Sequence, residues 1–262
     1  MLAVLSIAGS DSSGGAGIQA DIKTIAAHRL FAETAITALT AQNTMGVFGV
    51  EEAAPGFVAA QIDAVFDDIR PVAVKIGMVS SVAIIEAIAA RLAFWEAENI
   101  VLDPVMVSTS KAKLISDDAI DALKSALIPL ADVITPNLYE AEMLVGFALE
   151  GNKDMERAAS VLAESTHAAV LIKGGHSVNG ADDVLLTKEG EMVWMRGERI
   201  DTKNTHGTGC TLSSAIACNL ASGQSMAEAV RNAKAYVSGA LKNGIQLGHG
   251  SGPLNHMWEY AG

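Results

Sequence analysis

The stretch LAVLSIAGSDSSGGAGIQADIKTIAAH, from Leu2 to His28, opens the chain with a predicted strand, a glycine-rich turn and a predicted helix. The apolar run Leu2–Ala8 is short, which is typical of a strand buried on both faces. From Ala16 onward the apolar residues recur at helical spacing, so one face of a helix is expected to pack against that strand. A strand, a turn and a helix in this order form the unit from which parallel sheets are built.

Short apolar runs and helical patterns alternate in the same way along the rest of the chain. Further strands are predicted at residues 33–42, 72–77, 99–105, 132–137 and 168–175, with a hairpin over 182–196 that turns at Glu189 and Gly190. Further helices are predicted at residues 55–69, 81–98, 116–127, 138–146, 155–165 and 210–223, with a long final helix after the capping-box pair Ser225 and Glu228. This order predicts an α/β fold with a mostly parallel central sheet covered by helices on both faces.

The bulk composition sets the number of domains and excludes one class of partner. The 262 residues, half of them apolar, suffice for one large domain or two small ones. No linker or low-complexity run divides them, so residues 1–262 are predicted to form a single domain. The formal net charge is −12 and no stripe of Lys and Arg is present, which argues against a nucleic-acid partner. A few backbone N–H groups and one or two cations can still bind phosphate, so a nucleotide ligand remains open.

The termini and the cysteines indicate the compartment. The first residues lack the basic region of a signal peptide, and their apolar run breaks at Gly9. No apolar run reaches the length needed to span a membrane. Cys210 and Cys218 lie eight residues apart on one predicted helix, so they point in different directions and cannot form a disulfide with each other. The sequence therefore predicts a soluble cytoplasmic protein without a membrane partner.

Polar residues and glycines gather where the predicted strands end. In sheets of this type ligands bind beyond the carboxyl ends of the strands. The residues found there are Ser10, Asp11, Gln42, Gly77, Asp103, Asn137 and Lys173. Their clustering predicts one site at this edge of the sheet.

The turn NTHGTGCT, residues 204–211, supplies the first candidate for chemistry. Gly207 and Gly209 let the backbone approach a ligand closely, and the helix that follows presents unpaired N–H groups that stabilise a transferring phosphoryl group. The positive end of that helix favours the thiolate of Cys210, which can then accept a proton from an attacking hydroxyl. A plain helix start with an inert buried cysteine is the equally favoured alternative. His206 is expected to be a loop hydrogen-bonder rather than a catalyst.

Three further stretches offer surfaces for a flat ligand. The turn GSDSSGGAGIQAD, residues 9–21, matches neither the dinucleotide fingerprint nor the Walker A loop, and its small residues suit either a flat ligand or a flexible connection. Gln42 ends a strand, and its amide can pair with an aminopyrimidine edge or merely stabilise a loop. Met78 provides either a soft apolar wall or an ordinary core side chain.

Carboxylates and a lysine complete the candidate site. Asp103 follows a strand, and Asn137 and Glu140 share a helix face. Such oxygen ligands suit Mg²⁺ shared with substrate phosphates, although an acid in a first helical turn also interacts with the helix dipole alone. Lys173 stands among glycines at a strand end, where it can neutralise nucleotide phosphate or remain solvated.

Together these stretches resemble the ribokinase-like superfamily, and within it the hydroxymethylpyrimidine/phosphomethylpyrimidine kinases of its vitamin-kinase branch. The matching stretches run in the family's order from end to end: IAGSDSSGGAGIQADIKT, TALTAQNT, KIGM, LDPVMV, TPNLYEAE, VLIKGGH, NTHGTGCT and GHGSGPLNH. The resemblance implies a three-layer α/β/α fold and transfer of the ATP γ-phosphoryl group to 4-amino-5-hydroxymethyl-2-methylpyrimidine and then to its monophosphate. It also implies Mg²⁺ as a cofactor and a homodimer.

The resemblance assigns roles residue by residue. It implies that Cys210 lies nearest the reacting hydroxyl and that the backbone N–H groups of Gly207, Thr208 and Gly209 form an anion hole. The substrate would be bound by Gln42 at the aminopyrimidine edge, by Met78 and Val105 on either side of the ring, and by Asp21 and Gly9 nearby. Mg²⁺ and its waters would be organised by Asp103, Asn137 and Glu140, and the phosphate of ATP would contact Lys173.

One departure and three rivals accompany this interpretation. Lys111 and Ala112 stand where the family commonly has glycine, which alters the expected loop 109–113 beside the substrate. A pyridoxal kinase of the same superfamily is the nearest rival, and Gln42 favours the aminopyrimidine over it. A non-catalytic precursor-binding relative is the second. A sugar or nucleoside kinase is the third, disfavoured because those carry Asp at the position of Cys210 and a covering strand flap near the N-terminus that the sequence does not indicate.

Overall fold

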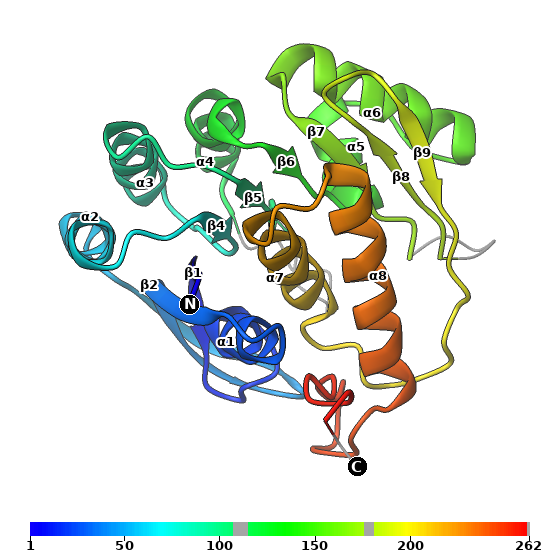
Figure 1. Cartoon of the computed structure of the whole chain (residues 1–262), viewed down its shortest axis with the longest axis horizontal. Helices are drawn as coiled ribbons and strands as arrows, with labels where there is room; N and C mark the ends of the chain where they lie inside the picture. The colour runs from blue at the N-terminus through cyan, green and yellow to red at the C-terminus, as the bar shows by residue number, and fades with distance from the viewer. Residues whose placement is uncertain (107–114, 176–180, 261–262) are drawn as a thin grey trace.

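The fold is built on one twisted sheet, seen in a computed structural model that describes residues 1–106, 115–175 and 181–260 (Figure 1). Within these residues the sheet has nine strands in the order β3-β2-β1-β4-β5-β6-β7-β8-β9. The strands are β1 Ala3–Asp11, β2 Phe31–Asn43, β3 Gly46–Glu52, β4 Ala73–Ile76, β5 Ile100–Leu102, β6 Val133–Ile134, β7 Ala169–Ile172, β8 Asp183–Leu186 and β9 Met192–Met195. In this order, the six strands β2, β1, β4, β5, β6 and β7 pair in parallel with their neighbours. Strand β3 at one edge and strands β8 and β9 at the other pair antiparallel.

Helices cover both faces of the sheet, as the sequence predicts. They are α1 Gly17–Ala27, α2 Pro55–Asp68, α3 Val82–Phe94, α4 Asp117–Ala122, α5 Leu138–Val145, α6 Asn152–Thr166, α7 Thr208–Ala221 and α8 Met226–Lys242. Helices α1, α7 and α8 lie on one face, and α2 to α6 lie on the other (Figure 1). Each face buries its own apolar cluster, because the central strands are apolar on both sides. The three-layer α/β/α prediction is therefore confirmed.

Single residues or residue pairs in the sequence set where several helices begin or are interrupted. Pro55 begins α2, and the pair Ser225 and Glu228 forms the expected capping box of α8. The predicted helix over residues 116–127 divides instead into α4, a π-helical turn Leu123–Leu127 and a 3₁₀ turn Ile128–Leu130. Pro129 has no N–H to donate, so the α-helical hydrogen-bond ladder cannot continue through it.

Strand β3 is the element that the sequence interpretation missed. It pairs antiparallel with β2 at the edge of the sheet, which supplies a strand hairpin near the N-terminus after all. The sequence indicated no strand flap near the N-terminus, and that absence was one argument against a sugar or nucleoside kinase. Because the β2–β3 hairpin is present, that argument is wrong. Apolar side chains of this edge are exposed, namely Leu39, Met45, Val47, Phe48 and Val50.

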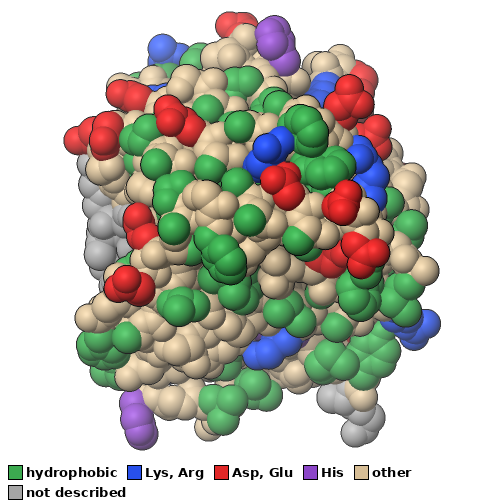
Figure 2. Space-filling view, turned by 90° about the vertical axis from the view of Figure 1, so that its left-hand side faces the viewer, with side chains coloured by type: hydrophobic (Ala, Val, Ile, Leu, Met, Phe, Trp, Pro, Cys, Tyr) green, Lys and Arg blue, Asp and Glu red, His purple; other side chains and the backbone are tan. Residues whose placement is uncertain are grey.

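Figure 2 shows the acidic side chains of the side that carries α2 and α3 over its upper half, with several basic side chains near them, whereas its lower part is mainly hydrophobic or uncharged. The net charge of the whole chain is −12. Among the described residues, no helix is both long enough and apolar enough to cross a lipid bilayer.

Glu33 of β2 is expected to make the stability of the fold depend on pH. The residue is 8% exposed, and within the described chain its Oε2 atom has no hydrogen-bond partner. Burial, reinforced by the nearby Asp68 carboxylate, raises the pKa of Glu33 to about 7. Because the unfolded chain releases this proton at a lower pH than the folded protein, the free energy of unfolding is expected to fall as the pH rises through this interval.

The variant Glu33→Gln should remove most of that decline. The wild-type free energy of unfolding is expected to drop by at most about 3 kcal/mol between about pH 5 and about pH 8 through this group, since one pKa unit corresponds to about 1.4 kcal/mol. Urea denaturation of both proteins at the two pH values measures the difference. An equal decline in the wild type and in Glu33→Gln would contradict the prediction.

Candidate active site

The site is organised around the N-terminus of α7. Gly207 precedes the helix in the left-handed conformation, with φ of 87°, and a Cβ atom there would overlap the carbonyl oxygen of Gly15. Only glycine fits such a position without strain. The first amides of the helix, from Thr208 to Cys210, lack partners four residues earlier in the helix, and the helix dipole adds a partial positive charge. In this conformation the N–H of Thr208 donates to Thr205 O at 3.3 Å.

An acidic and a basic side chain face this helix end. Lys173 follows β7, and its Nζ donates to Asp103 Oδ1, beyond β5, at 2.7 Å. Thr135 Oγ1, beyond β6, donates to the same oxygen at 3.0 Å. A Cβ atom on Gly209 would lie 3.2 Å from Asp103 Oδ2 and 3.5 Å from Lys173 Nζ. Three neighbouring strands and the helix therefore converge on one point, as the sequence predicts for this edge of the sheet.

Asn137 and Glu140 are tied to each other in a capping box at the start of α5. Asn137 Oδ1 accepts the N–H of Glu140 at 3.0 Å, and Glu140 Oε2 accepts the N–H of Asn137 at 2.9 Å. Glu140 Oε1 also accepts the N–H of Met106 at 3.4 Å. Burial raises the pKa of Glu140 to about 7, although the Lys173 ammonium opposes this. Both residues therefore reach the site as parts of a fixed turn.

Cys210 lies in the first turn of α7 and is half-buried. Burial raises the pKa of its thiol, while the ammonium of Lys75 and the N–H of Gly17 act in the opposite direction. Burial therefore acts against the expectation that the start of α7 favours the thiolate of Cys210. The two cysteines are free, as their spacing predicts.

Met78, Gly9 and Val105 lie at the carboxyl ends of three adjacent strands. The Met78 side chain covers Gly9, where an added Cβ atom would stand 2.6 Å from the Met78 Cε atom. The Met78 carbonyl accepts the hydroxyl of Thr37 at 2.8 Å. Val105 is half-buried just beyond β5, where its N–H donates to Asp103 O at 2.8 Å. Met78 and Gly9 are therefore in contact, and Val105 follows the neighbouring strand β5 at the same edge of the sheet.

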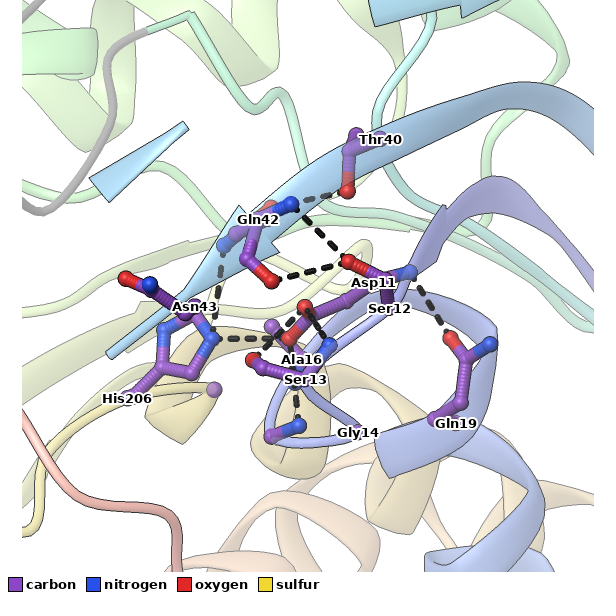
Figure 3. A network of polar contacts seen from close by, with 12 residues as sticks. Asp11, Ser12, Ser13, Gly14, Ala16, Gln19, Thr40, Gln42, Asn43 and His206 are labelled. Carbon is purple, nitrogen blue, oxygen red and sulfur yellow. Dashed lines mark hydrogen bonds and ion pairs between the residues drawn. The ribbon is translucent and has the colours of Figure 1, made fainter. Parts of the chain in front are cut away.

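Gln42 stands at the end of β2, close to the loop that precedes α7. Figure 3 shows its amide facing His206 on one side and Thr40 on the other, with Asp11 at the end of β1 behind the imidazole. The distance from Gln42 Nε2 to His206 Nε2 is 3.4 Å, and His206 Nε2 lies 2.8 Å from Asp11 Oδ2. His206 is thus the hydrogen-bonding loop residue that the sequence predicts.

Asp21 does not reach the surface of the site. It is fully buried in α1, where its carboxylate accepts Lys75 Nζ at 2.8 Å and 3.0 Å. The hydroxyls of Ser6 and Ser214 donate to it at 2.6 Å and 2.7 Å. A carboxylate with all these donors in the interior cannot contact a ligand in this conformation, so the prediction that Asp21 binds substrate is corrected: the residue supports the site from beneath.

The fold and these contacts agree with a known family. The sequence model described as phosphomethylpyrimidine kinase matches residues 11–255, nearly the whole chain. The chain belongs to this family.

Individual relatives of this kinase point the same way. The chain is 47% identical over 255 residues to a hydroxymethylpyrimidine/phosphomethylpyrimidine kinase of Streptomyces coelicolor, covering 97% of this chain and 94% of that one. It is 46% identical to a thiamine biosynthesis bifunctional protein of Geobacter sulfurreducens, covering 97% of this chain and 52% of that protein. The crystal structure of an ADP complex of Bacillus subtilis pyridoxal kinase is 37% identical and has a TM-score of 0.92, with both chains fully covered.

Sequence reasoning missed Lys75 at the kinase site and named Asp11 there without its role. Lys75 interrupts the apolar strand β4, and a lysine in a buried strand signals an acidic partner nearby. Asp11 was placed at a strand end, but nothing in the local pattern indicated how many donors it collects. The expected loop 109–113, with Lys111 and Ala112, lies outside the described residues.

Proposed function

We propose that residues 1–262 form a single cytoplasmic kinase domain that phosphorylates 4-amino-5-hydroxymethyl-2-methylpyrimidine and then its monophosphate, using ATP, in thiamin biosynthesis. Membership of the phosphomethylpyrimidine kinase family supports the substrate class. The observation that carries the chemistry is the glycine-bounded start of α7 facing the pair Asp103 and Lys173. Amides and an ammonium aimed at one point suit the negative charge that develops on a transferring phosphoryl group.

The groups at the start of α7 would form the end of the site that binds ATP and Mg²⁺. The amides of Gly207, Thr208 and Gly209 would stabilise the migrating phosphoryl group, and Lys173 would neutralise phosphate of ATP. Asp103 Oδ2 faces the helix end, so this oxygen fits a Mg²⁺ ion that otherwise keeps its waters and phosphate ligands. Both oxygens of Glu140 already accept N–H groups, so Glu140 and Asn137 fit contacts to the ion's waters better than direct ligation. When bound, the ion would draw charge from the phosphate oxygens.

The pyrimidine end lies between β1, β2, β4 and β5. Met78 and Val105 would enclose the flat ring, and Gly9 would leave room for the Met78 side chain that lies over it. The amide of Gln42 would pair with the exocyclic amine and the adjacent ring nitrogen, since it offers one acceptor and one donor side by side. Cys210 would receive the proton of the attacking hydroxyl, with the ammonium of Lys75 favouring the thiolate against burial.

Exposed apolar side chains support the proposal of a homodimer. They lie along the β2–β3 edge, where Phe48 is 71% and Met45 is 65% exposed. An exposed strand edge with apolar side chains is prone to pair with another chain. The mass of the protein in solution, measured by light scattering, tests this part of the proposal.

A coupled ADP assay with Mg²⁺ tests the function. The kcat/KM value for the hydroxymethylpyrimidine is expected to exceed that for pyridoxal, which is the competing substrate because a pyridoxal kinase is so similar in fold. A preference for pyridoxal would reassign the substrate. Absence of ADP formation with every hydroxymethyl compound would leave only the precursor-binding alternative.

Replacement of Cys210 tests the proton transfer. Cys210→Ala is expected to lower kcat by about 100-fold or more while changing KM little, because general-base catalysis of this kind contributes about 10²–10⁴ in rate. Cys210→Asp should retain part of the activity, since a carboxylate also accepts a proton. Steady-state kinetics with both substrates varied measure the effect. An unchanged kcat in Cys210→Ala would reduce the residue to a packing role.

Replacement of Gln42 tests the pyrimidine end. Gln42→Ala is expected to raise KM for the pyrimidine about tenfold or more, because it removes two hydrogen bonds, and to leave KM for ATP unchanged. The same assay measures both constants. A rise in KM for ATP instead would show that the two ends of the site have been exchanged.

A further inference from the structure

Asp11 is a carboxylate held by five hydrogen bonds at the end of β1. Its Oδ1 accepts the N–H of Ser13 at 2.8 Å and the hydroxyl of Ser13 at 2.7 Å. Its Oδ2 accepts the N–H groups of Gly15 at 3.1 Å and Ala16 at 2.8 Å, and His206 Nε2 lies 2.8 Å away. Burial opposes ionisation, but the hydrogen bonds from His206 and Ser13 outweigh it and lower the pKa of the carboxyl. Asp11 is therefore ionised and can only accept hydrogen bonds.

The position of Asp11 decides which imidazole nitrogen of His206 carries a hydrogen. A carboxylate oxygen 2.8 Å from Nε2 requires a donor there, so Nε2 must be protonated. The imidazole ring has little freedom to turn, because it is buried against Gly15. The backbone of His206 is also held in place, since its N–H donates to Gly252 O at 3.1 Å. The single hydrogen on Nε2 therefore points to Asp11, and the nitrogen keeps no lone pair for a donor from Gln42, which lies beside it at 3.4 Å (Figure 3).

This N–H restricts the amide of Gln42 to one orientation. In the structure the amide nitrogen lies 3.4 Å from His206 Nε2, and the amide oxygen accepts the Thr40 hydroxyl at 3.1 Å. A half-turn of the amide exchanges these two atoms without moving the side chain, so the hydrogen-bond network decides between the two orientations. An amide nitrogen beside His206 would set one donor against another, so the oxygen must face the imidazole. The nitrogen then faces Thr40, whose hydroxyl has a lone pair free for it because its own hydrogen reaches Ser10 O at 3.0 Å.

We infer that Asp11, acting through the Nε2–H group of His206, fixes the orientation of the Gln42 amide and thereby the order in which the pocket presents acceptor and donor to the pyrimidine edge. This inference rests on the proposed contact between Gln42 and the pyrimidine. The remaining lone pair of Oε1 accepts from the exocyclic amine, and the remaining N–H donates to the ring nitrogen. A 4-oxo edge offers the opposite order and is rejected. Asp11 and His206 are positioning residues in this account.

Two variants of His206 and two substrates test the inference. The substrates are the 4-amino compound and its 4-oxo analogue, whose ring nitrogen carries a hydrogen. Wild type is expected to prefer the amino compound by about 100-fold or more in kcat/KM, because the wrong edge leaves buried polar groups unpaired. His206→Leu should lower this ratio at least about tenfold, chiefly through KM for the amino compound. His206→Gln, which restores an N–H donor, should recover most of the ratio.

The substrate ratio separates positioning from general damage. His256→Leu is the matched control, because His256 is also buried and contacts Thr211 of α7 at 3.0 Å instead of Gln42. Its ratio is expected to equal that of the wild type. If His206→Leu loses activity equally on both substrates, the inference is overturned.

A second measurement does not depend on turnover or on the stability of a variant. Long-range ¹⁵N–¹H NMR of the wild-type protein reports which nitrogen of His206 is protonated. A protonated Nε2 is expected, and an unprotonated Nε2 would overturn the inference. If Nε2 is protonated but the amino compound is not phosphorylated at all, the proposed function fails while the inference can still be tested. Calorimetry then measures the binding of the amino and oxo compounds to wild type and to His206→Leu. The inference holds if the ratio of the two affinities falls in His206→Leu, and it is overturned if that ratio is unchanged.

Discussion

Gly207→Ala should abolish most phosphoryl transfer while leaving the protein folded. The residue has φ of 87°, and the new methyl group would overlap the carbonyl oxygen of Gly15 in the neighbouring glycine-rich turn. Either the turn or the start of α7 must move, so the amides of residues 207–209 would leave the position of the transferring phosphoryl group. Loss of a single donor of this kind costs about 10²–10³ in kcat, and here several donors move together. We expect kcat to fall by at least about 100-fold in the ADP assay.

Gly223→Ala is the control for backbone strain at the other end of the same helix. Gly223 has φ of 80°, but a Cβ atom there meets no other atom of the described chain within 4 Å. Gly223→Ala should lose about 1 kcal/mol of stability through the left-handed conformation, and Gly207→Ala should lose more because of its additional overlap with Gly15, as urea denaturation measures. Only Gly207→Ala should lose kcat. Equal kcat values in the two variants would show that the start of α7 does not bind the phosphoryl group.

The fold was predictable because its signals are local. Apolar runs such as Ala73–Ile76 and helical spacing such as that of α3 are set by which faces each element buries, and a central parallel sheet buries both faces of its strands. The meeting of Asp103 and Lys173 followed from the same topology, since parallel strands end at one edge. β3 escaped prediction because an exposed edge strand needs no alternation of apolar and polar residues.

The sequence-based expectations that the structure changes depend on how deeply a side chain is buried, not on which residue stands at the position. Asp21 was assigned to the substrate because its position in the motif says nothing about which way the first turns of α1 face. The thiolate of Cys210 was expected from the helix dipole, yet burial raises the pKa of this thiol, and that burial comes from residues far apart in sequence. The orientation of Gln42 likewise depends on Asp11 and His206, which are 195 residues apart.

Lys75 and Asp21 form the support on which this site rests. Both side chains are fully buried, and Lys75 Nζ contacts both oxygens of the Asp21 carboxylate. Burial disfavours the ammonium, but Asp21 together with the more distant Asp103 holds the pKa of Lys75 above its ordinary value. The pair is therefore ionised at neutral pH, and removal of one partner leaves the other charge without compensation in the interior.

Lys75→Met is expected to destabilise the protein by about 3–5 kcal/mol, because it leaves the Asp21 carboxylate buried with only its serine donors. Adding Asp21→Asn should recover part of this loss, since the double variant buries no charge, and the coupling between the two sites should exceed about 1 kcal/mol in a double-mutant cycle. Lys188→Met is the matched control: its ion pair with Asp132 is as short, at 2.6 Å, but partly exposed, so it should cost at most about 1 kcal/mol. Urea denaturation of Lys75→Met, Asp21→Asn, the double variant, Lys188→Met and the wild type measures the free energies of unfolding.

Two outcomes would contradict this prediction. Equal losses of stability for Lys75→Met and Lys188→Met would mean that the buried pair is not the support of the site. Additive losses in the double variant would mean that Asp21 does not depend on Lys75 for its charge.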